Sequence, residues 1–184
     1  MLKNLETDYL VVGAGATGMA FVDEIIHRAN DVHVVLVDRL DSPGGHWNHA
    51  YPFVTLHQPA LYYGVNSEQL GRGGADLVSK TEILDYYDRV IQKLVGTGRV
   101  SYFPRHEYRG DGHFVSMTEP GIEYQVKVRR RVVDSTYTNV TVPSTTPPNY
   151  EVDPDVALIP INGLAKLDRD WSRYVVIGAG KTGM

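Results

Sequence analysis

The sequence contains no cysteine. This absence excludes a disulfide scaffold, a thiolate metal site and a dithiol redox centre within the 184 residues. It is compatible with a reducing compartment, and we expect a cytoplasmic protein. Long hydrophobic runs are also absent. Residues 9–12 form the most apolar early stretch and end in glycines, and the N-terminus lacks the basic and apolar regions of a signal peptide. We therefore expect no contact with a membrane.

Basic residues are in the minority. The 18 lysines and arginines are outnumbered by 22 aspartates and glutamates, which gives a formal net charge of −4. A general nucleic-acid binder needs a basic surface to neutralise phosphates, so we expect no nucleic-acid partner. The only basic run, Lys127 with Arg129 to Arg131, is interpreted as a solvated strand edge. Apolar residues make up 42% of the chain, which is enough for a sizeable core.

The first forty residues predict a strand, a helix and a second strand. Residues 8–12 (DYLVV) indicate a short buried strand, and the apolar spacing from Met19 to Ile26 predicts a helix that ends near Asn30. Residues 33–37 (HVVLV) predict the second strand. This unit has the length of one crossover between parallel strands, so we expect an α/β fold with a parallel sheet.

The middle of the chain predicts a further helix and a change of strand pattern. Residues 81–95 have the apolar spacing of an amphipathic helix, with Thr81 as its expected N-cap. The stretch from about 100 to 127 alternates apolar and polar residues, with turn signals at 110–112 and 120–121. We expect this stretch to form an antiparallel β insertion beside the parallel sheet.

A glycine-rich turn lies between the first strand and the first helix. It reads Gly13-Ala14-Gly15-Ala16-Thr17-Gly18, and Asp38 follows twenty positions after the last glycine. Gly13 allows a sharp turn, Gly15 allows a pyrophosphate to approach the backbone, and Gly18 allows close packing of helix on strand. Asp38 can accept hydrogen bonds from ribose hydroxyls, and Arg39 lies beside it. The arrangement predicts a Rossmann-like dinucleotide site.

The same pattern begins again near the end of the sequence. Residues 174–177 (YVVI) predict another buried strand, followed by Gly178, Gly180 and Gly183 at the same spacing. A phosphate-loop interpretation fails, because it requires a glycine where Val175 stands. We interpret the motif as the start of a second dinucleotide site. NAD and NADP cannot be distinguished, because the residue that would read the ribose is not in the sequence.

These motifs suggest a division of the chain into three parts. We expect residues 1–150 to form a first dinucleotide-binding domain, which the family resemblance given below assigns to FAD. Residues 151–173 would form a linker, and a proline-rich connector from Pro143 to Pro154 leads into it. Residues 174–184 would be the first strand and glycine turn of an NAD(P)-binding domain that is cut off after its beginning.

These stretches resemble the flavoproteins with two dinucleotide-binding domains, particularly the flavin-containing and Baeyer–Villiger monooxygenases. Residues 8–18 resemble the FAD motif of this group, and residues 37–38 resemble its ribose-binding acid. The segment Gly44-Gly45-His46-Trp47 resembles the G-G-x-W element that lies along the flavin. Gln58 stands where related monooxygenases place a polar amide near the flavin ring. The resemblance implies that FAD binds to the first motif and that NAD(P)H binds to the second.

Two segments depart from the pattern of these monooxygenases. Residues 161–171 keep the spacing, the glycine and the terminal aromatic residue of the fingerprint that precedes the second motif. Ile161 replaces its phenylalanine, however, and Leu167 replaces its histidine. At 134–136 the sequence reads Asp-Ser-Thr, where such flavoproteins often have Ala-Thr-Gly at the end of a strand near the FAD.

The loop after the second strand carries three histidines and an aromatic group. His46 and His49 could tune the flavin or relay a proton, or they could be ordinary loop histidines. No carboxylate or thiolate completes a metal site with them and His57, so we expect no bound metal. The aromatic residues could shield the flavin ring or form a satellite core. They are Trp47, Tyr51, Phe53, Tyr62 and Tyr63.

We therefore expect the FAD-binding part of an NAD(P)H-dependent flavoprotein oxidoreductase that resembles a monooxygenase and acts on a small-molecule substrate. Hydride would pass from nicotinamide to flavin and then to oxygen or another acceptor. The chain alone would be inactive, and no catalytic residue is assigned. Two alternatives remain open. One is a disulfide-reductase-like enzyme whose cysteines lie in the second domain, and the other is a non-catalytic FAD-binding protein.

Overall fold

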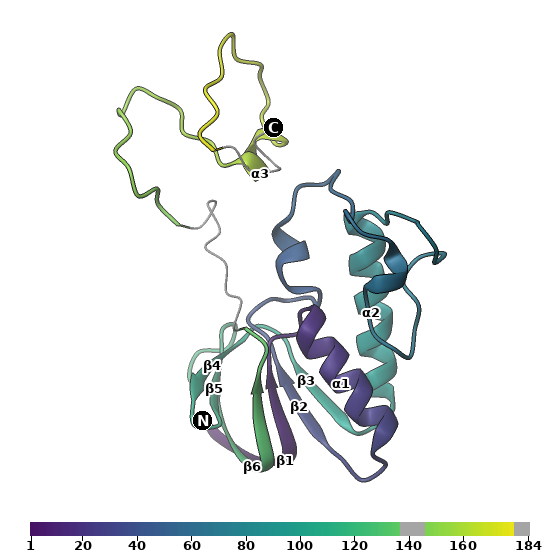
Figure 1. Ribbon diagram of the computed structural model, residues 1–184. Coiled ribbons are helices and arrows are strands. Elements are labelled where there is room, and N and C mark those ends of the chain that lie inside the picture. The colour runs from purple at the N-terminus through teal and green to yellow at the C-terminus, as the bar shows by residue number, and fades with distance from the viewer. Residues whose placement is uncertain (137–145, 179–184) are drawn as a thin grey trace.

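The computed structural model describes residues 1–136 and 146–178 (Figure 1). Its main feature is a curled sheet of six strands in the order β3-β2-β1-β6-β5-β4. The strands are β1 (Leu2–Val12), β2 (Val34–Val37), β3 (Val100–Phe103), β4 (His106–Gly110), β5 (His113–Ser116) and β6 (Glu123–Asp134). The α-helices are α1 (Ala16–Arg28), α2 (Lys80–Gly96) and α3 (Ile161–Leu164), and the short 3-10 helices are η1 (Gly45–His49) and η2 (Ala60–Tyr62). The predicted α/β class is confirmed.

The parallel part of the sheet is larger than the sequence indicated. β1 pairs in parallel with β2 on one side and with β6 on the other, and β3 pairs in parallel with β2. The expected antiparallel insertion from 100 to 127 therefore begins too early, because β3 belongs to the parallel part, whereas β6 pairs antiparallel with β5 and in parallel with β1. β3 follows the crossover helix α2, which returns the chain in the direction of β2. Among the strands of the described residues, the β4–β5 and β5–β6 pairs are antiparallel, and their turns lie where the sequence predicted them.

Helix α2 begins earlier than expected because a different residue caps it. The Ser79 side chain accepts a hydrogen bond from the Glu82 N–H, and the Glu82 carboxylate accepts one from the Ser79 N–H. This reciprocal pair is a capping box, which needs a glutamate three positions after the serine. The predicted cap, Thr81, has Leu84 at that position and cannot form one.

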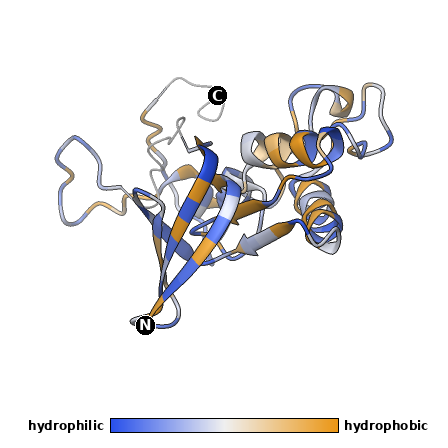
Figure 2. Ribbon diagram, turned by 90° about the horizontal axis from the view of Figure 1, so that it is seen from below, coloured by the Kyte–Doolittle hydropathy of each residue, from blue (hydrophilic) through white to orange (hydrophobic). Residues whose placement is uncertain are grey.

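The core lies mainly between the sheet and the two long helices, which cover one face (Figure 1). Tyr86 and Tyr87 of α2 and Met19 of α1 are among its fully buried side chains. A smaller cluster fills the other face, where the curl of the sheet brings β5 and β6 over β1 and β2. It contains Leu10, Val35, Val37, Phe114 and Val126. Figure 2 shows the resulting alternation of hydrophobic and hydrophilic residues along the strands near the N-terminus.

The predicted strand at 174–177 is not formed in the structure. Residues 173–178 have no regular secondary structure, and the apolar side chains from Tyr174 to Ile177 are between 55% and 90% exposed. No strand of the described residues pairs with this segment, and an apolar strand is stable only when its faces are covered. Gly178 has a positive φ of 122°, whereas Gly180 and Gly183 lie outside the described residues. None of the helices in the described ranges is long and apolar enough to span a membrane.

Candidate functional site

The carboxyl ends of three parallel strands meet at the glycine-rich turn. In the sheet register, Val12 of β1 is level with Val37 of β2 and with Asp134 of β6. The three strands end at this level. Gly13 directly follows β1 and Asp38 directly follows β2, so the two residues are neighbours. Ligands of open α/β sheets bind at this edge, outside the carboxyl ends of the strands.

Gly13 is fixed by hydrogen bonds to both neighbouring strands. Its N–H donates to the carbonyl of Val37 at 2.8 Å. Its carbonyl accepts from the Ser135 hydroxyl at 2.8 Å, and the same hydroxyl lies 2.6 Å from the carbonyl of Val12. Ser135 was noted in the sequence only as a departure from a family pattern. The available signal for its role was its position, because Ser135 is a hydroxyl residue that directly follows β6, the strand beside β1.

Ala14 is also hydrogen-bonded on both sides, in this case by residues that follow β2. Its N–H donates to the carboxylate of Asp38, and its carbonyl accepts from the N–H of Gly44 at 2.8 Å. Asp38 is only 6% exposed, and its second oxygen accepts from the N–H of Leu40 at 2.7 Å. Burial raises the pKa of Asp38, and the two backbone hydrogen bonds oppose the rise. Arg39, next in the chain, is exposed.

The next backbone N–H groups differ from those of Gly13 and Ala14, because none of them has a hydrogen-bond partner within the described residues. Helix α1 begins after Gly15 with no side-chain cap and no acidic residue in its first turn. Among the described residues, no acceptor lies within hydrogen-bond range of the N–H groups of residues 15–18. Such groups at a helix N-terminus, together with the positive end of the helix dipole, form a favourable place for an anion.

The three glycines of the motif differ in what the fold requires of them. Gly13 has a φ of 97°, and a Cβ at Gly18 would lie 1.9 Å from the carbonyl oxygen of Gly13. The fold itself therefore excludes side chains at both positions. A Cβ at Gly15 would meet only the backbone of Gly45, at an ordinary 3.6 Å from its Cα. Packing of the described chain therefore does not explain why residue 15 lacks a side chain.

The loop after β2 brings the G-G-x-W segment onto this turn. Gly44 and Gly45 have φ values of 106° and 57°, which allow the backbone of the loop to lie against Gly15. Trp47 is 7% exposed, and its indole N–H donates to the Tyr63 hydroxyl at 2.7 Å. Trp47 is thus part of the main core on the helix side of the sheet and not of a separate satellite core under the loop.

The other predicted site residues are exposed or half-buried. His46 is exposed as a whole residue, but the surrounding protein covers part of its imidazole ring. This partial desolvation lowers the pKa of His46. Thr17 is exposed on the first turn of α1. Gln58 donates a hydrogen bond to the carbonyl of Tyr62 at 3.4 Å, and no hydrogen bond within the described residues joins it to the glycine turn. His46, His49 and His57 do not form a cluster of metal ligands in the described part of the chain.

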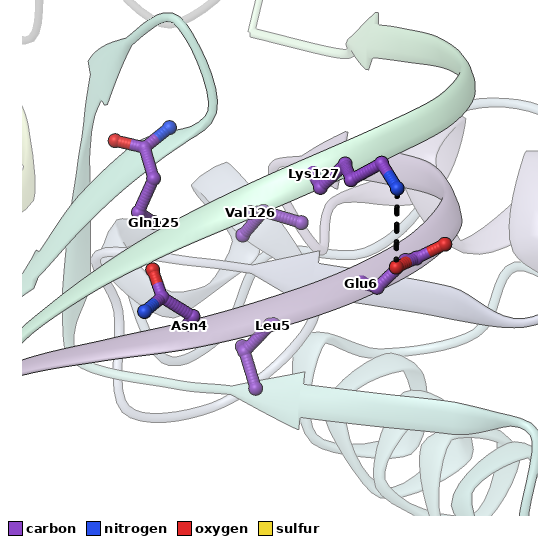
Figure 3. A pocket seen from close by; sticks show the side chains of 6 residues that line it. All are labelled: Asn4, Leu5, Glu6, Gln125, Val126 and Lys127. Carbon is purple, nitrogen blue, oxygen red and sulfur yellow. Dashed lines mark hydrogen bonds and ion pairs between the residues drawn. The ribbon is translucent and has the colours of Figure 1, made fainter.

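A hollow of about 500 Å³ lies at the opposite end of β1 and β6 (Figure 3). Glu6 and Lys127 form an ion pair of 3.5 Å across it. Its lining comes from the N-terminal halves of the two strands and is made of Asn4, Leu5, Glu6, Gln125, Val126 and Lys127. None of these residues belongs to the turn, so this hollow is separate from the candidate site.

Comparison with known proteins shows which families the chain is similar to. Residues 11–66 match the family described as an NAD(P)-binding Rossmann-like domain. An uncharacterised protein of Mycobacterium tuberculosis is 53% identical over 194 residues, covering 99% of this chain and 35% of the relative. The chain thus spans about a third of the length of the curated relatives it matches. An FAD-binding monooxygenase of Aspergillus niger is 29% identical over 85 residues, covering 46% of this chain and 14% of the relative.

Solved structures of flavoproteins share the fold. A flavin-containing monooxygenase from Stenotrophomonas maltophilia matches with a TM-score of 0.53 and 20% identity, covering 72% of this chain and 38% of that one. A polycyclic ketone monooxygenase from Thermothelomyces thermophila matches with a TM-score of 0.55 and 16% identity, covering 72% and 23%. The structure therefore has a Rossmann-like fold that resembles the fold of flavin-containing and Baeyer–Villiger monooxygenases, in agreement with the resemblance seen in the sequence.

A disulfide reductase has a similar fold. The bacillithiol disulfide reductase from Staphylococcus aureus matches with a TM-score of 0.50 and 10% identity, covering 67% of this chain and 38% of that one. The fold therefore does not choose between the two enzyme classes considered from the sequence.

Proposed function

We propose that this chain is the FAD-binding domain of an NAD(P)H-dependent flavoprotein oxidoreductase of the monooxygenase type. The observation that carries the proposal is the state of the glycine turn. Gly13 and Ala14 are hydrogen-bonded through both their N–H and their carbonyl groups, whereas the N–H groups of residues 15–18 have no partner in the described chain. Unpaired N–H groups need an acceptor, and a pyrophosphate supplies several.

Electrostatics and sterics both favour a pyrophosphate at this position. The negative charge would lie at the positive end of the α1 dipole, which no acidic side chain in the first turn neutralises. The missing side chain at Gly15 leaves its backbone open to a phosphate. This also accounts for a glycine that packing within the chain does not require.

The segment after Gly44 fits a group that extends from the pyrophosphate. This segment lies against Gly15. We propose that Gly45 and His46 border the flavin and that the buried side chain of Trp47 holds these two residues in place. When bound, FAD would accept hydride from a nicotinamide and pass reducing equivalents to oxygen or another acceptor. We propose that NAD(P)H binds a second domain that begins near Gly178, and that the protein acts on a small-molecule substrate.

The visible absorption spectrum tests FAD binding directly. The purified protein is mixed with FAD, desalted and scanned, and the flavin released on denaturation is identified. We expect stoichiometric FAD in the wild type and none in Gly15→Ala. Because a Cβ at Gly15 makes only an ordinary contact in the free protein, the variant should keep the wild-type unfolding temperature. A folded wild type that stays colourless, or a variant that retains FAD fully, would overturn the assignment.

Enzyme class needs a separate experiment on the longer protein. We expect NAD(P)H oxidation coupled to oxygen uptake in the presence of a suitable substrate. Reduction of a disulfide substrate with no oxygen uptake would favour the reductase alternative. Stable FAD binding without any NAD(P)H oxidation would favour a non-catalytic flavoprotein.

A further inference from the structure

The side chain of Lys80, the first residue of α2, contacts the end of η1. Its ammonium group donates to the carbonyl of Ala50 at 2.7 Å and to the carbonyl of Asn48 at 3.3 Å. The carbonyl between these two, that of His49, accepts from the side-chain amide of Asn162 at 3.0 Å. The last carbonyls of a helix have no partner within it, and a cation is favoured there. The ammonium group therefore fixes the end of η1.

The main chain of Lys80 is held in place as well. Its N–H donates to the carbonyl of Val54 at 2.9 Å. Ser79, directly before it, forms an isolated antiparallel bridge with Thr55 and the capping box with Glu82. The side chain thus starts from an ordered backbone, and η1 is joined to the beginning of α2.

Asn48 connects the end of η1 to its beginning. Its carbonyl accepts from Lys80, and its side-chain nitrogen donates to the carbonyls of Pro43 and Gly45, each at 3.1 Å. Gly45 in turn packs against Gly15 of the glycine turn. A continuous path of contacts therefore leads from Lys80 through Asn48 to Gly45.

From this path we propose that Lys80 is a positioning residue for the flavin end of the site. It acts through η1, by holding Gly45 and His46 where they border the flavin. The inference rests on the proposed function, because it concerns the same FAD. The glycine turn has supports of its own in the hydrogen bonds of Gly13 and Ala14. Loss of the ammonium group should therefore affect the flavin part of FAD and not its ADP part.

Comparison of FAD with ADP, which is the part of FAD without the flavin, tests the proposal. Both are titrated into the wild type and Lys80→Met, which keeps an unbranched apolar side chain but lacks the ammonium group. We expect Lys80→Met to weaken FAD about 10-fold and to leave the ADP affinity within about twofold of the wild type. Equal weakening of the two nucleotides, or no change in either, would overturn the proposal.

Lys93→Met is the matched control. Lys93 lies in the last turn of the same helix and pairs with Glu68, away from η1. The control removes the same charge, and we expect it to leave the ratio of FAD to ADP affinity at its wild-type value. A fall of the same size as in Lys80→Met would show that net charge sets the ratio, and would refute the role of η1.

Tryptophan fluorescence gives a readout that does not depend on the nucleotide. The chain has two tryptophans, so Trp171→Phe leaves Trp47 of η1 as the single emitter. Trp47 is 7% exposed and directly precedes Asn48. In this background we expect Lys80→Met to shift the emission to longer wavelength and to increase its quenching by acrylamide, and Lys93→Met to change neither.

The fluorescence also separates this proposal from the proposed function. If the wild type binds neither FAD nor ADP, the proposed function fails, and the emission of Trp47 alone decides whether Lys80 positions η1. An emission that is unchanged in Lys80→Met would then refute it.

A second variant covers the case in which Lys80→Met does not fold. Lys80→Gln keeps N–H donors, but its side chain is uncharged and one atom shorter. We expect the ratio of FAD to ADP affinity to fall in this variant as well. A wild-type ratio in Lys80→Gln would show that the ammonium group does not position η1.

Discussion

The backbones of Gly15 and Gly45 lie in direct contact, although thirty positions of sequence separate the two motifs to which they belong. A Cβ at Gly45 would come within 3.0 Å of the Gly15 Cα. The N–H of the adjacent Gly44 holds the two segments together through the carbonyl of Ala14 at 2.8 Å. The loop after β2 therefore packs on the glycine turn by main-chain contacts. A side chain at Gly45 would disturb this contact, whereas one at Gly15 would make only an ordinary contact.

Gly45→Ala should move this loop away from the turn. The substitution places a side chain at a φ of 57°, which costs about 1–2 kcal/mol, and adds a contact that is too close to Gly15. Gly74→Ala is a matched control, because Gly74 has a φ of 64° and open space around its Cβ. We expect both variants to lose stability in urea unfolding and only Gly45→Ala to lose FAD affinity. Equal FAD affinity in the two variants would contradict the contact.

Gly18→Ala should destabilise the fold even without a ligand. Its Cβ would lie 1.9 Å from the Gly13 carbonyl oxygen, so helix α1 must move away from β1. We expect the free energy of unfolding to fall by about 2 kcal/mol or more, measured by urea unfolding of the FAD-free protein. Gly96→Ala, at the end of α2 with no neighbour near its Cβ, should be neutral or stabilising by about 0.5–1 kcal/mol. A smaller loss in Gly18→Ala than in Gly45→Ala would argue against tight packing of α1.

The adjacent tyrosines of α2 should respond differently to loss of their hydroxyls. The Tyr86 hydroxyl accepts from the Val65 N–H at 2.7 Å and donates to the Glu68 carbonyl at 2.8 Å, and burial raises its pKa to about 12. Tyr86→Phe leaves both backbone groups unpaired and should cost about 1–3 kcal/mol.

Tyr87→Phe provides the control for this substitution. The Tyr87 hydroxyl is buried and has no hydrogen-bond partner among the described residues. Its removal should therefore be neutral or slightly stabilising when the thermal unfolding of both variants is compared with that of the wild type. Equal destabilisation by the two variants would show that the loop at 65–68 is not held by Tyr86.

Asp8 should make the protein less stable in acid. The N–H of His33, at 2.9 Å, and the guanidinium of Arg129, at 3.0 Å, hold the pKa of Asp8 below its ordinary value. Asp8 in the folded state thus binds its proton less readily than in the unfolded state. Its contribution is complete above the unfolded pKa of about 3.9 and is lost as the pH falls through the folded pKa. In urea unfolding at a series of pH values, Asp8→Asn should flatten the acid side of the stability curve, and an unchanged slope would refute this role.

The sequence predicted the local elements around the site and missed those that depend on distant pairing. The glycine turn, α1 and β2 follow from apolar spacing within forty residues. β1 begins at Leu2 and not near Asp8, because its first half alternates polar and apolar residues and is stabilised by pairing with Glu123 to Val128 of β6. Ser135 was missed for the same reason, since its role exists only when β6 lies beside β1.

The hydrogen bonds of the Asp38 carboxylate show a different limit of sequence-based prediction. Spacing correctly placed the acid beside the glycine turn, but the direction of a carboxylate depends on which N–H groups the folded backbone leaves within reach. Conversely, the apolar run at 174–177 has the composition of a strand, yet it forms none in the described structure because composition supplies no pairing partner.

The bond between the Ser135 hydroxyl and the Val12 carbonyl joins residues that are 123 positions apart in the chain. A growing polypeptide can therefore form the unit from β1 to β2 early, but the turn at the end of β1 gains its support from β6 only when that strand has been synthesised. Contacts of such long sequence separation slow folding, because a large loop must close before they form. During synthesis, the candidate site is thus one of the last parts of this sheet to form completely, although its glycines are among the first residues made.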